Sequence, residues 1–70
     1  MSNVKVNEVY RHFKGNTYRV IAIAKDCDDL KELVVYQNID KGDVWVRPLD
    51  NFTQSITRDG KTFERFKKIK

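Results

Sequence analysis

Residues 44–52 read Val44-Trp45-Val46-Arg47-Pro48-Leu49-Asp50-Asn51-Phe52. The alternation of small and large side chains in the first four positions is typical of a strand with two different faces. Pro48 has no N–H to give to a sheet ladder and holds Arg47 extended, so it ends the strand. Because proline suits the first position of a helix, residues 48–52 are predicted to form one short helical turn that packs Leu49 and Phe52 beneath the sheet.

The rest of the chain divides into short strands separated by polar turns. The expected strands cover residues 9–13, 18–25, 32–38, 53–57 and 62–66. Gly15-Asn16 and Asp59-Gly60 are hairpin turn signals, because these residue types accept a positive φ. No segment keeps a helical period. The pattern predicts an all-β domain, and its strand–proline–turn layout favours an SH3-like barrel of about five to six antiparallel strands with one helical turn near residues 48–52.

Turn positions also predict which residues face each other across the hairpins. With turns at Gly15-Asn16, Lys41-Gly42 and Asp59-Gly60, the expected neighbours are Phe13 with Tyr18, Tyr36 with Arg47, and Ile56 with Phe63. A slip of one residue would reverse the faces that meet.

The length of 70 residues fits one domain. We expect residues 1–8, which are polar apart from Val4 and Val6, to be a flexible lead-in, and residues 9–70 to be the folded domain. Without an apolar run of about 18 residues, no membrane-spanning segment is expected. The single cysteine, Cys27, forms no internal disulfide and fits a reducing cytoplasm, which is the expected location.

Charge is unevenly distributed along the chain. The net charge is +4, divided as +3 over residues 1–24, −3 over residues 25–43 and +4 over residues 44–70. Basic ends of this kind can attract polyanions.

Two blocks of the sequence carry a resemblance to a known family. They are Tyr10-Arg11-His12-Phe13-Lys14-Gly15-Asn16 and Trp45-Val46-Arg47-Pro48-Leu49, with Leu33-Val34-Val35-Tyr36 between them. In these residues the chain resembles a bacterial family, domain-of-unknown-function family 1653, from about Tyr10 to Ile69. The resemblance implies a small SH3-like β-barrel with no established biochemical activity. Asp26-Cys27-Asp28-Asp29 stands where the family tends to have a His-Ser-Glu-Thr-like turn, so the resemblance gives that loop no role.

Catalytic signals are weak. His12 is the only histidine, no metal-ligand spacing occurs, and no phosphate loop or dinucleotide fingerprint is present, so no cofactor is expected. A thiol-dependent enzyme using Cys27 is a remote alternative. The carboxylates of Asp26, Asp28 and Asp29 would oppose thiolate formation there. We therefore expect a protein that is not an enzyme.

Binding is better supported. Flat rings and cations occur together at Tyr10, Arg11, His12, Tyr36, Trp45 and Arg47. We predict that these six side chains form an aromatic and basic surface for an anionic or peptide ligand, or for an unknown protein partner. The competing interpretation is that Tyr36 and Trp45 wall the core, and that Arg47 pairs with Asp50 or Glu32.

Nucleic acid is the alternative partner. The basic residues that would contact RNA or DNA phosphates in that case are Lys14, Arg65, Lys67 and Lys68. A membrane is not an expected partner.

Overall fold

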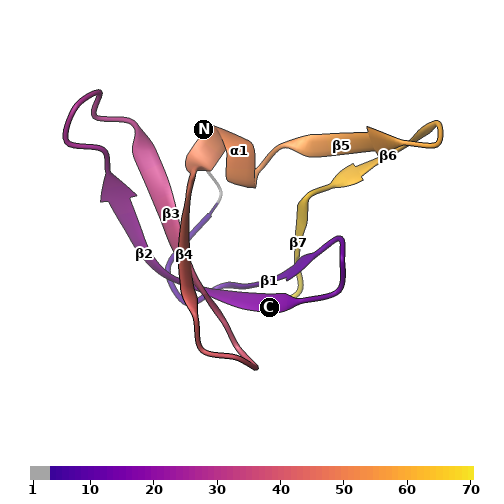
Figure 1. The fold of residues 1–70 in the computed structure, drawn as a ribbon, viewed down its shortest axis with the longest axis horizontal. Coiled ribbons are helices and arrows are strands. Elements are labelled where there is room, and N and C mark those ends of the chain that lie inside the picture. Colours follow the sequence, from indigo (N-terminus) through magenta and orange to yellow (C-terminus); the bar gives the residue numbers. More distant parts are fainter. Residues whose placement is uncertain (1–3) are drawn as a thin grey trace.

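A computed structural model describes residues 4–70, which form strands and one short helix (Figure 1). In chain order the elements are β1 (Val9–His12), β2 (Thr17–Lys25), β3 (Glu32–Asn38), β4 (Val44–Pro48), α1 (Leu49–Phe52), β5 (Ser55–Arg58), β6 (Lys61–Glu64) and β7 (Phe66–Lys68). The predicted all-β class and the short helical turn are confirmed. Among residues 4–70, no helix has the length and apolar character needed to cross a membrane.

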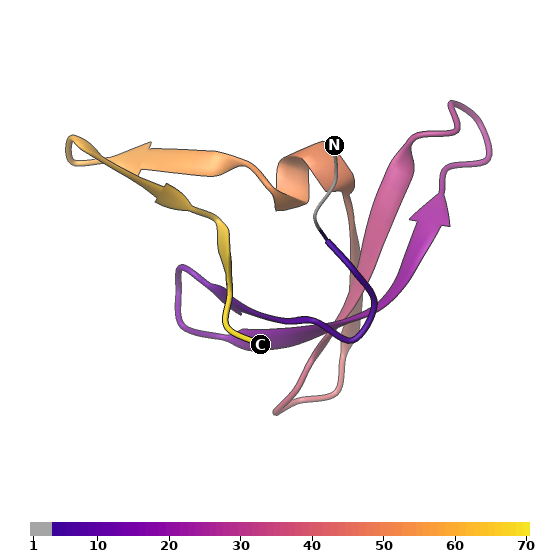
Figure 2. The ribbon, with the colours of Figure 1, turned by 180° about the vertical axis from the view of Figure 1, so that it is seen from behind.

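Five strands form one antiparallel sheet, in the order β4-β3-β2-β1-β7. The remaining two, β5 and β6, form a separate hairpin that extends to one side of the main sheet (Figures 1 and 2). The described residues therefore contain seven strands, where five to six were predicted. The extra strand arises because the chain turns at Arg65, so that β7 leaves β6 and pairs with β1.

The core is a cluster of aromatic rings beneath the sheet. Phe52, supplied by α1, is stacked on Phe66 of β7 with ring centroids 4.1 Å apart and planes at 8°. The edges of Tyr10 and Tyr36 meet Phe52 at 5.1 and 5.4 Å. Such edge-to-face contacts are favoured by the ring quadrupoles. The turn after Pro48 therefore does what the sequence predicts, because it places Phe52 inside at 1% exposure.

Two of the three predicted hairpin registers are wrong, and the third is confirmed. Ile56 faces Phe63 as expected. Tyr18, however, pairs with Tyr10, because the first turn spans four residues and is closed by bonds from His12 N to Asn16 O and from Gly15 N to His12 O.

The β3–β4 register is displaced by a side chain. Tyr36 pairs with Trp45, where Arg47 was predicted. The cause is Asn38, whose buried Oδ1 accepts the backbone N–H groups of Asp40 and Lys41, both at 2.9 Å. This cap fixes a longer loop than a two-residue turn.

Residues 4–8 contact the body of the domain. Val4 is buried in the core cluster, and Asn7 N donates to Val20 O at 2.8 Å. This part of the expected lead-in is therefore packed against the domain, and the expectation for residues 1–3 lies outside the described residues.

Candidate functional site

Arg47 lies over the aromatic core at the end of β4. Its Nε donates to the hydroxyl of Tyr36 at 3.1 Å, and its Nη1 donates to Oδ1 of Asn51 at 2.6 Å. The guanidinium carbon is 5.6 Å from the ring centroid of Phe66, within cation–π range. Pro48 positions this group, because it ends β4 and starts the turn that brings Asn51 back towards Arg47.

A second arginine is linked to the first through two amides. Arg65 Nη2 donates to Oε1 of Gln54 at 3.2 Å, and the same oxygen accepts from Nδ2 of Asn51 at 3.5 Å. The Nε atom of Arg65 is buried and has no hydrogen-bond partner among residues 4–70. The side-chain amides of Asn51 and Gln54 hold the two guanidinium groups in place. Because amides carry no charge, they do not neutralise either arginine.

His12 lies between these arginines and the β1–β2 turn. Its ring centroid is 4.4 Å from that of Phe13 and 4.9 Å from that of Phe66. Burial lowers the pKa of His12, and the charges of Arg47, Arg65 and Lys14 lower it further. Nδ1 accepts the backbone N–H of Lys14 at 3.2 Å, so the neutral ring carries its proton on Nε2.

The ring of Phe13 lies close to Lys14 and to one further cation, Arg58. Lys14 Nζ and the guanidinium carbon of Arg58 lie 5.9 and 5.5 Å from its ring centroid. Phe13 also contacts Phe63 at 5.6 Å, which joins the β1–β2 turn to the β5–β6 hairpin. This contact brings Arg58 alongside a site otherwise built from the main sheet.

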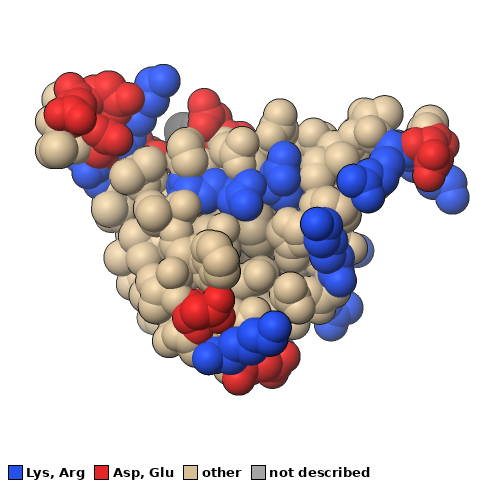
Figure 3. All heavy atoms as spheres, viewed as in Figure 1, with Lys and Arg blue, Asp and Glu red and all other residues tan. Residues whose placement is uncertain are grey.

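We call the surface formed by Lys14, Arg47, Arg58 and Arg65 around His12 and Phe13 the cationic face. In Figure 3, Lys and Arg atoms spread across the molecule from the α1 region towards the β5–β6 hairpin, and acidic atoms lie mainly at the outer turns. Within residues 4–70 the ion pair that forms is Lys68 Nζ to Glu8 Oε2, at 2.9 Å. None of the four cations of this face has a carboxylate within 4.0 Å among those residues.

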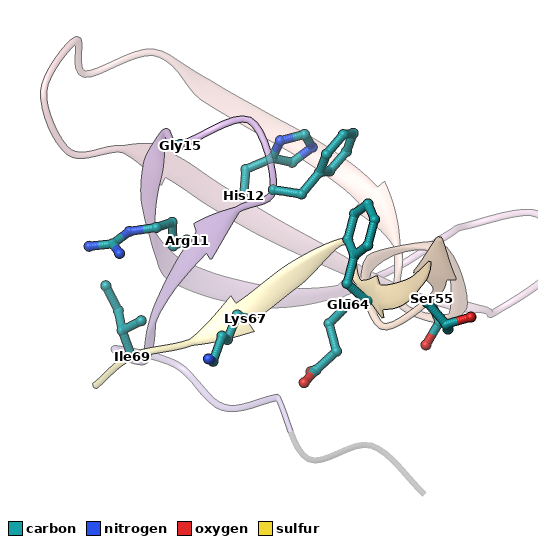
Figure 4. A pocket seen from close by; sticks show the side chains of 10 residues that line it. Arg11, His12, Gly15, Ser55, Glu64, Lys67 and Ile69 are labelled. Carbon is teal, nitrogen blue, oxygen red and sulfur yellow. The ribbon is translucent and has the colours of Figure 1, made fainter. Parts of the chain in front are cut away.

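A groove of about 750 Å³ opens beside this face, between β7, the β1–β2 turn and the β5–β6 hairpin. The groove shares His12 and Phe13 with the cationic face. Its lining also includes Arg11 and Lys67, which are cross-strand partners on β1 and β7. Glu64 and Ser55 border the other side, and Ile69 adds apolar surface (Figure 4). Because it mixes both signs of charge, this groove suits an anion less well than the cationic face does.

The structure distributes the six predicted ligand-binding residues over several environments. Tyr10 and Tyr36 are buried at 7% and 4% exposure, so their rings face the core and cannot contact a ligand, which corrects that part of the prediction. Their hydroxyl groups are bonded to Glu8 and to Arg47. Both residues lie on inner strands of the sheet, β1 and β3, and belong to the core cluster.

The other four remain accessible in part. His12 and Arg47 are half-buried on the cationic face. Trp45 is 51% exposed on the edge strand β4, with Nε1 donating to Asp43 at 2.7 Å. Arg11 lines the groove. The pairing of Arg47 with Asp50 or Glu32 does not form.

The four residues of the nucleic-acid alternative also separate. Lys14 and Arg65 join the cationic face, whereas Lys67 lies in the groove and Lys68 is paired with Glu8. Of the four residues, Lys14 and Arg65 therefore lie on one surface, and nucleic-acid binding stays a prediction.

Sequence reasoning missed four residues of this region. They are Glu8, Asn51, Gln54 and Arg58. Asn51 could have been found from its spacing, four residues after Arg47 across a predicted turn. The others depend on contacts between distant segments, for which the sequence has no local signal.

Cys27 lies apart from this region, in the β2–β3 loop. Its side chain is exposed, and its Sγ is 3.8 Å from Oδ1 of Asp28. Possible ligand atoms of Asp26, Cys27 and Asp28 lie within 4.8 Å of one another. Asp26 Oδ1 already accepts the backbone N–H of Asp28, which explains the cluster as a turn.

Comparison with known proteins gives one match. Residues 8–68 match the family described as "Protein of unknown function (DUF1653)". No curated protein and no solved structure matches the chain. The matched range includes every residue of the cationic face, and the chain belongs to this family of unknown function, DUF1653.

Proposed function

We propose that this protein is a non-catalytic binding module that holds an anionic ligand on the cationic face. The observation that supports this most strongly is the unneutralised charge around His12. Arg47, Arg65 and Lys14 all lower its pKa, and no carboxylate within residues 4–70 pairs with any of them.

The chemistry of the donors favours an oxyanion. An oxygen of phosphate or carboxylate accepts charge-assisted hydrogen bonds from cations that no carboxylate neutralises. Arginine donors form a planar fork that matches the geometry of such groups. The Nε2–H of neutral His12 is a further donor, and the amides of Asn51 and Gln54 hold both arginines before any ligand arrives. Preorganised donors lose little freedom on binding.

The test is a titration of the protein with inorganic pyrophosphate, followed by the NMR signals of His12 and of the Arg65 Nε–H group. We expect saturable shifts that sodium chloride at the same ionic strength does not reproduce. Arg65→Gln and Lys14→Gln should each weaken binding by about fivefold or more, since each removes one charge-assisted donor.

Lys67→Gln is the matched control, because it removes one exposed positive charge from the groove. It should change the affinity by less than about twofold. If Lys67→Gln weakens binding as much as Arg65→Gln does, the affinity reflects net charge, and the proposed site is wrong.

Single-stranded nucleic acid is the second candidate for the anion. It is favoured by Lys14 and Arg65, which belong to the cationic face, and by the exposed ring of Trp45, which is on the same strand as Arg47. Aromatic platforms stack on bases, and cations contact phosphates. Single-stranded RNA should then compete with pyrophosphate and bind with a steep dependence on salt. Binding of pyrophosphate without any competition by RNA would exclude this candidate.

A further inference from the structure

Strand β4 is an edge of the five-stranded sheet and carries an exposed apolar sequence. Val44, Trp45 and Val46 are 54%, 51% and 59% exposed. Edge strands are normally protected by lysines, bulges or covering segments. Here the ladder with β3 is continuous, no lysine lies within β4, and proline occurs only at its last residue.

The hydrogen bonds of the β3–β4 loop show which backbone groups of this edge are free. Asn38 N donates to Asp43 O at 2.9 Å, so the two residues form a hydrogen-bonded pair. Such pairs alternate along an antiparallel ladder, so Trp45 and Arg47 also bond to β3. Val44 and Val46 therefore direct their N–H and C=O groups towards the open edge.

Symmetry limits how this edge could pair with a second copy. A two-fold axis perpendicular to the sheet keeps each side chain on its own face, so antiparallel β4 strands must be centred on one residue. Centring on Val44 would need the N–H of Gly42, which already donates to Asn38 O at 2.8 Å. Centring on Val46 would need an N–H from Pro48, which has none.

Centring on Trp45 avoids both losses. Val44 of each copy then faces Val46 of the other copy. The free N–H and C=O groups of these two residues all form hydrogen bonds between the copies. The same register puts Asp43 opposite Arg47 of the second copy, on the face that carries Trp45. Opposite charges therefore meet at both ends of the strand pair, and the two exposed indole rings meet at its centre.

We propose that β4 pairs antiparallel with β4 of a second copy of this chain about a two-fold axis at Trp45. The occupant of the edge is a second copy because the strand is complementary to itself in backbone groups, in apolar side chains and in charge. This dimer uses Arg47 of the cationic face and none of Lys14, Arg58 and Arg65. Amide exchange and mass test it without any anion, so the dimer can fail while anion binding stands.

Amide hydrogen exchange of the unaltered protein tests the proposal directly. The amides of Val44 and Val46 should become protected as the concentration rises from about 10 µM to 1 mM, whereas the amide of Trp45, bonded to β3 in either state, should be protected throughout. Sedimentation should show a mass of twice 8.3 kDa over the same range. The fluorescence emission of Trp45, the single tryptophan, should change over the same concentration range.

Charge reversal tests the register. Asp43→Lys puts a lysine opposite Arg47 at both ends and should weaken the dimer by at least about tenfold. Asp40→Lys changes the net charge equally, in the same loop but outside the strand pair, and should leave the dimer within about twofold of the original.

Three results would overturn the proposal. The first is a single-chain mass at 1 mM, with Val44 and Val46 amides exchanging equally fast at both concentrations. The second is equal weakening by Asp40→Lys and Asp43→Lys. The third is protection of these amides that appears only on addition of an apolar strand-forming peptide, since the edge would then serve a different occupant.

Discussion

The hydroxyl of Tyr36 accepts a hydrogen bond of 3.1 Å from Nε of Arg47, and this contact joins the buried core to the cationic face. Tyr36 is 4% exposed, so its polar atom is satisfied inside the domain by a charge that reaches the surface. Arg47 therefore has two roles, because the group that stabilises the core also carries charge at the candidate site. Substitutions on β4 can separate these roles.

Arg47→Ala should lower the free energy of unfolding by about 1–3 kcal/mol. The loss arises because the buried hydroxyl of Tyr36 loses its donor and Asn51 loses a charge-assisted bond. Urea unfolding followed by circular dichroism measures the change. A loss below about 0.5 kcal/mol would mean that the bonds of Arg47 to Tyr36 and Asn51 contribute little to the stability of the core.

Trp45→Ala is the comparison on the same strand and the same face. Its ring is half exposed and bonded to Asp43 at the surface, so its removal should change the free energy of unfolding by less than about 1 kcal/mol. The measurement belongs at micromolar concentration, where pairing of β4 strands is negligible. A loss of about 3–5 kcal/mol, as for a core aromatic residue, would contradict its place at the surface.

Phe52→Ala should unfold the domain at room temperature. Phe52 is 1% exposed and contacts Phe66, Tyr10 and Tyr36. Its truncation costs about 3–5 kcal/mol, which is comparable with the whole net stability of a core this small. The near-ultraviolet circular dichroism signal should be lost. Phe52→Leu, which keeps most of the volume, should remain folded with a lower melting temperature.

The elements of this fold follow from local sequence signals. Strand β3 was predicted with its observed bounds, and the turn after Pro48 and the facing pair of Ile56 and Phe63 were also predicted. Each depends on residues close together in the chain: apolar runs, one proline, and an Asp-Gly turn whose Asp59 and Gly60 both have positive φ.

What the sequence could not predict depends on distant partners. The β3–β4 register is set by the side chain of Asn38, and β7 exists because the chain turns at Arg65 to reach β1. The same limit applies to the candidate site. Individual cations were identifiable, but their convergence on His12 needs Arg47 and Arg65, which are distant in the chain, to lie near the β1–β2 turn.

The stability of the protein should fall below pH 4.5 through one carboxyl group that the sequence did not single out. The ion pair with Lys68, supported by bonds from the Lys5 N–H and the Tyr10 hydroxyl, lowers the pKa of Glu8 from 4.5 to about 2. A group with a lowered folded-state pKa stabilises the fold above its unfolded value and loses that contribution as the pH falls through the folded value. The window is therefore pH 4.5 to about 2.

Glu8→Gln should reduce this acid dependence and cost about 1–3 kcal/mol at pH 7, because charge-assisted bonds become neutral ones. Urea unfolding at several pH values measures both effects. Glu64→Gln is the control, because it removes one exposed negative charge and should change the free energy of unfolding at pH 7 by less than about 0.5 kcal/mol. Equal slopes in the original protein and in Glu8→Gln would show that other groups cause the acid dependence.

The pKa of His12 should rise when an anion occupies the cationic face. In the free protein this pKa lies below its ordinary value of 6.5, because burial and the charges of Arg47, Arg65 and Lys14 oppose protonation. Because its folded-state pKa is lowered, His12 stabilises the fold at pH values above 6.5. This contribution is lost as the pH falls from 6.5 through the folded-state pKa. A bound anion would offset the three cations and favour imidazolium, and the proton NMR signals of the ring report the titration.

Arg65→Gln separates the electrostatic cause from burial. Without one of the opposing charges, the pKa of His12 should be higher in the free protein, and pyrophosphate should raise it less than in the original protein. Sodium chloride at matched ionic strength screens the same cations without occupying the site, so it should produce a smaller rise. If chloride and pyrophosphate raise the pKa of His12 equally, screening alone explains the rise. The donors around His12 would then not form a specific anion site.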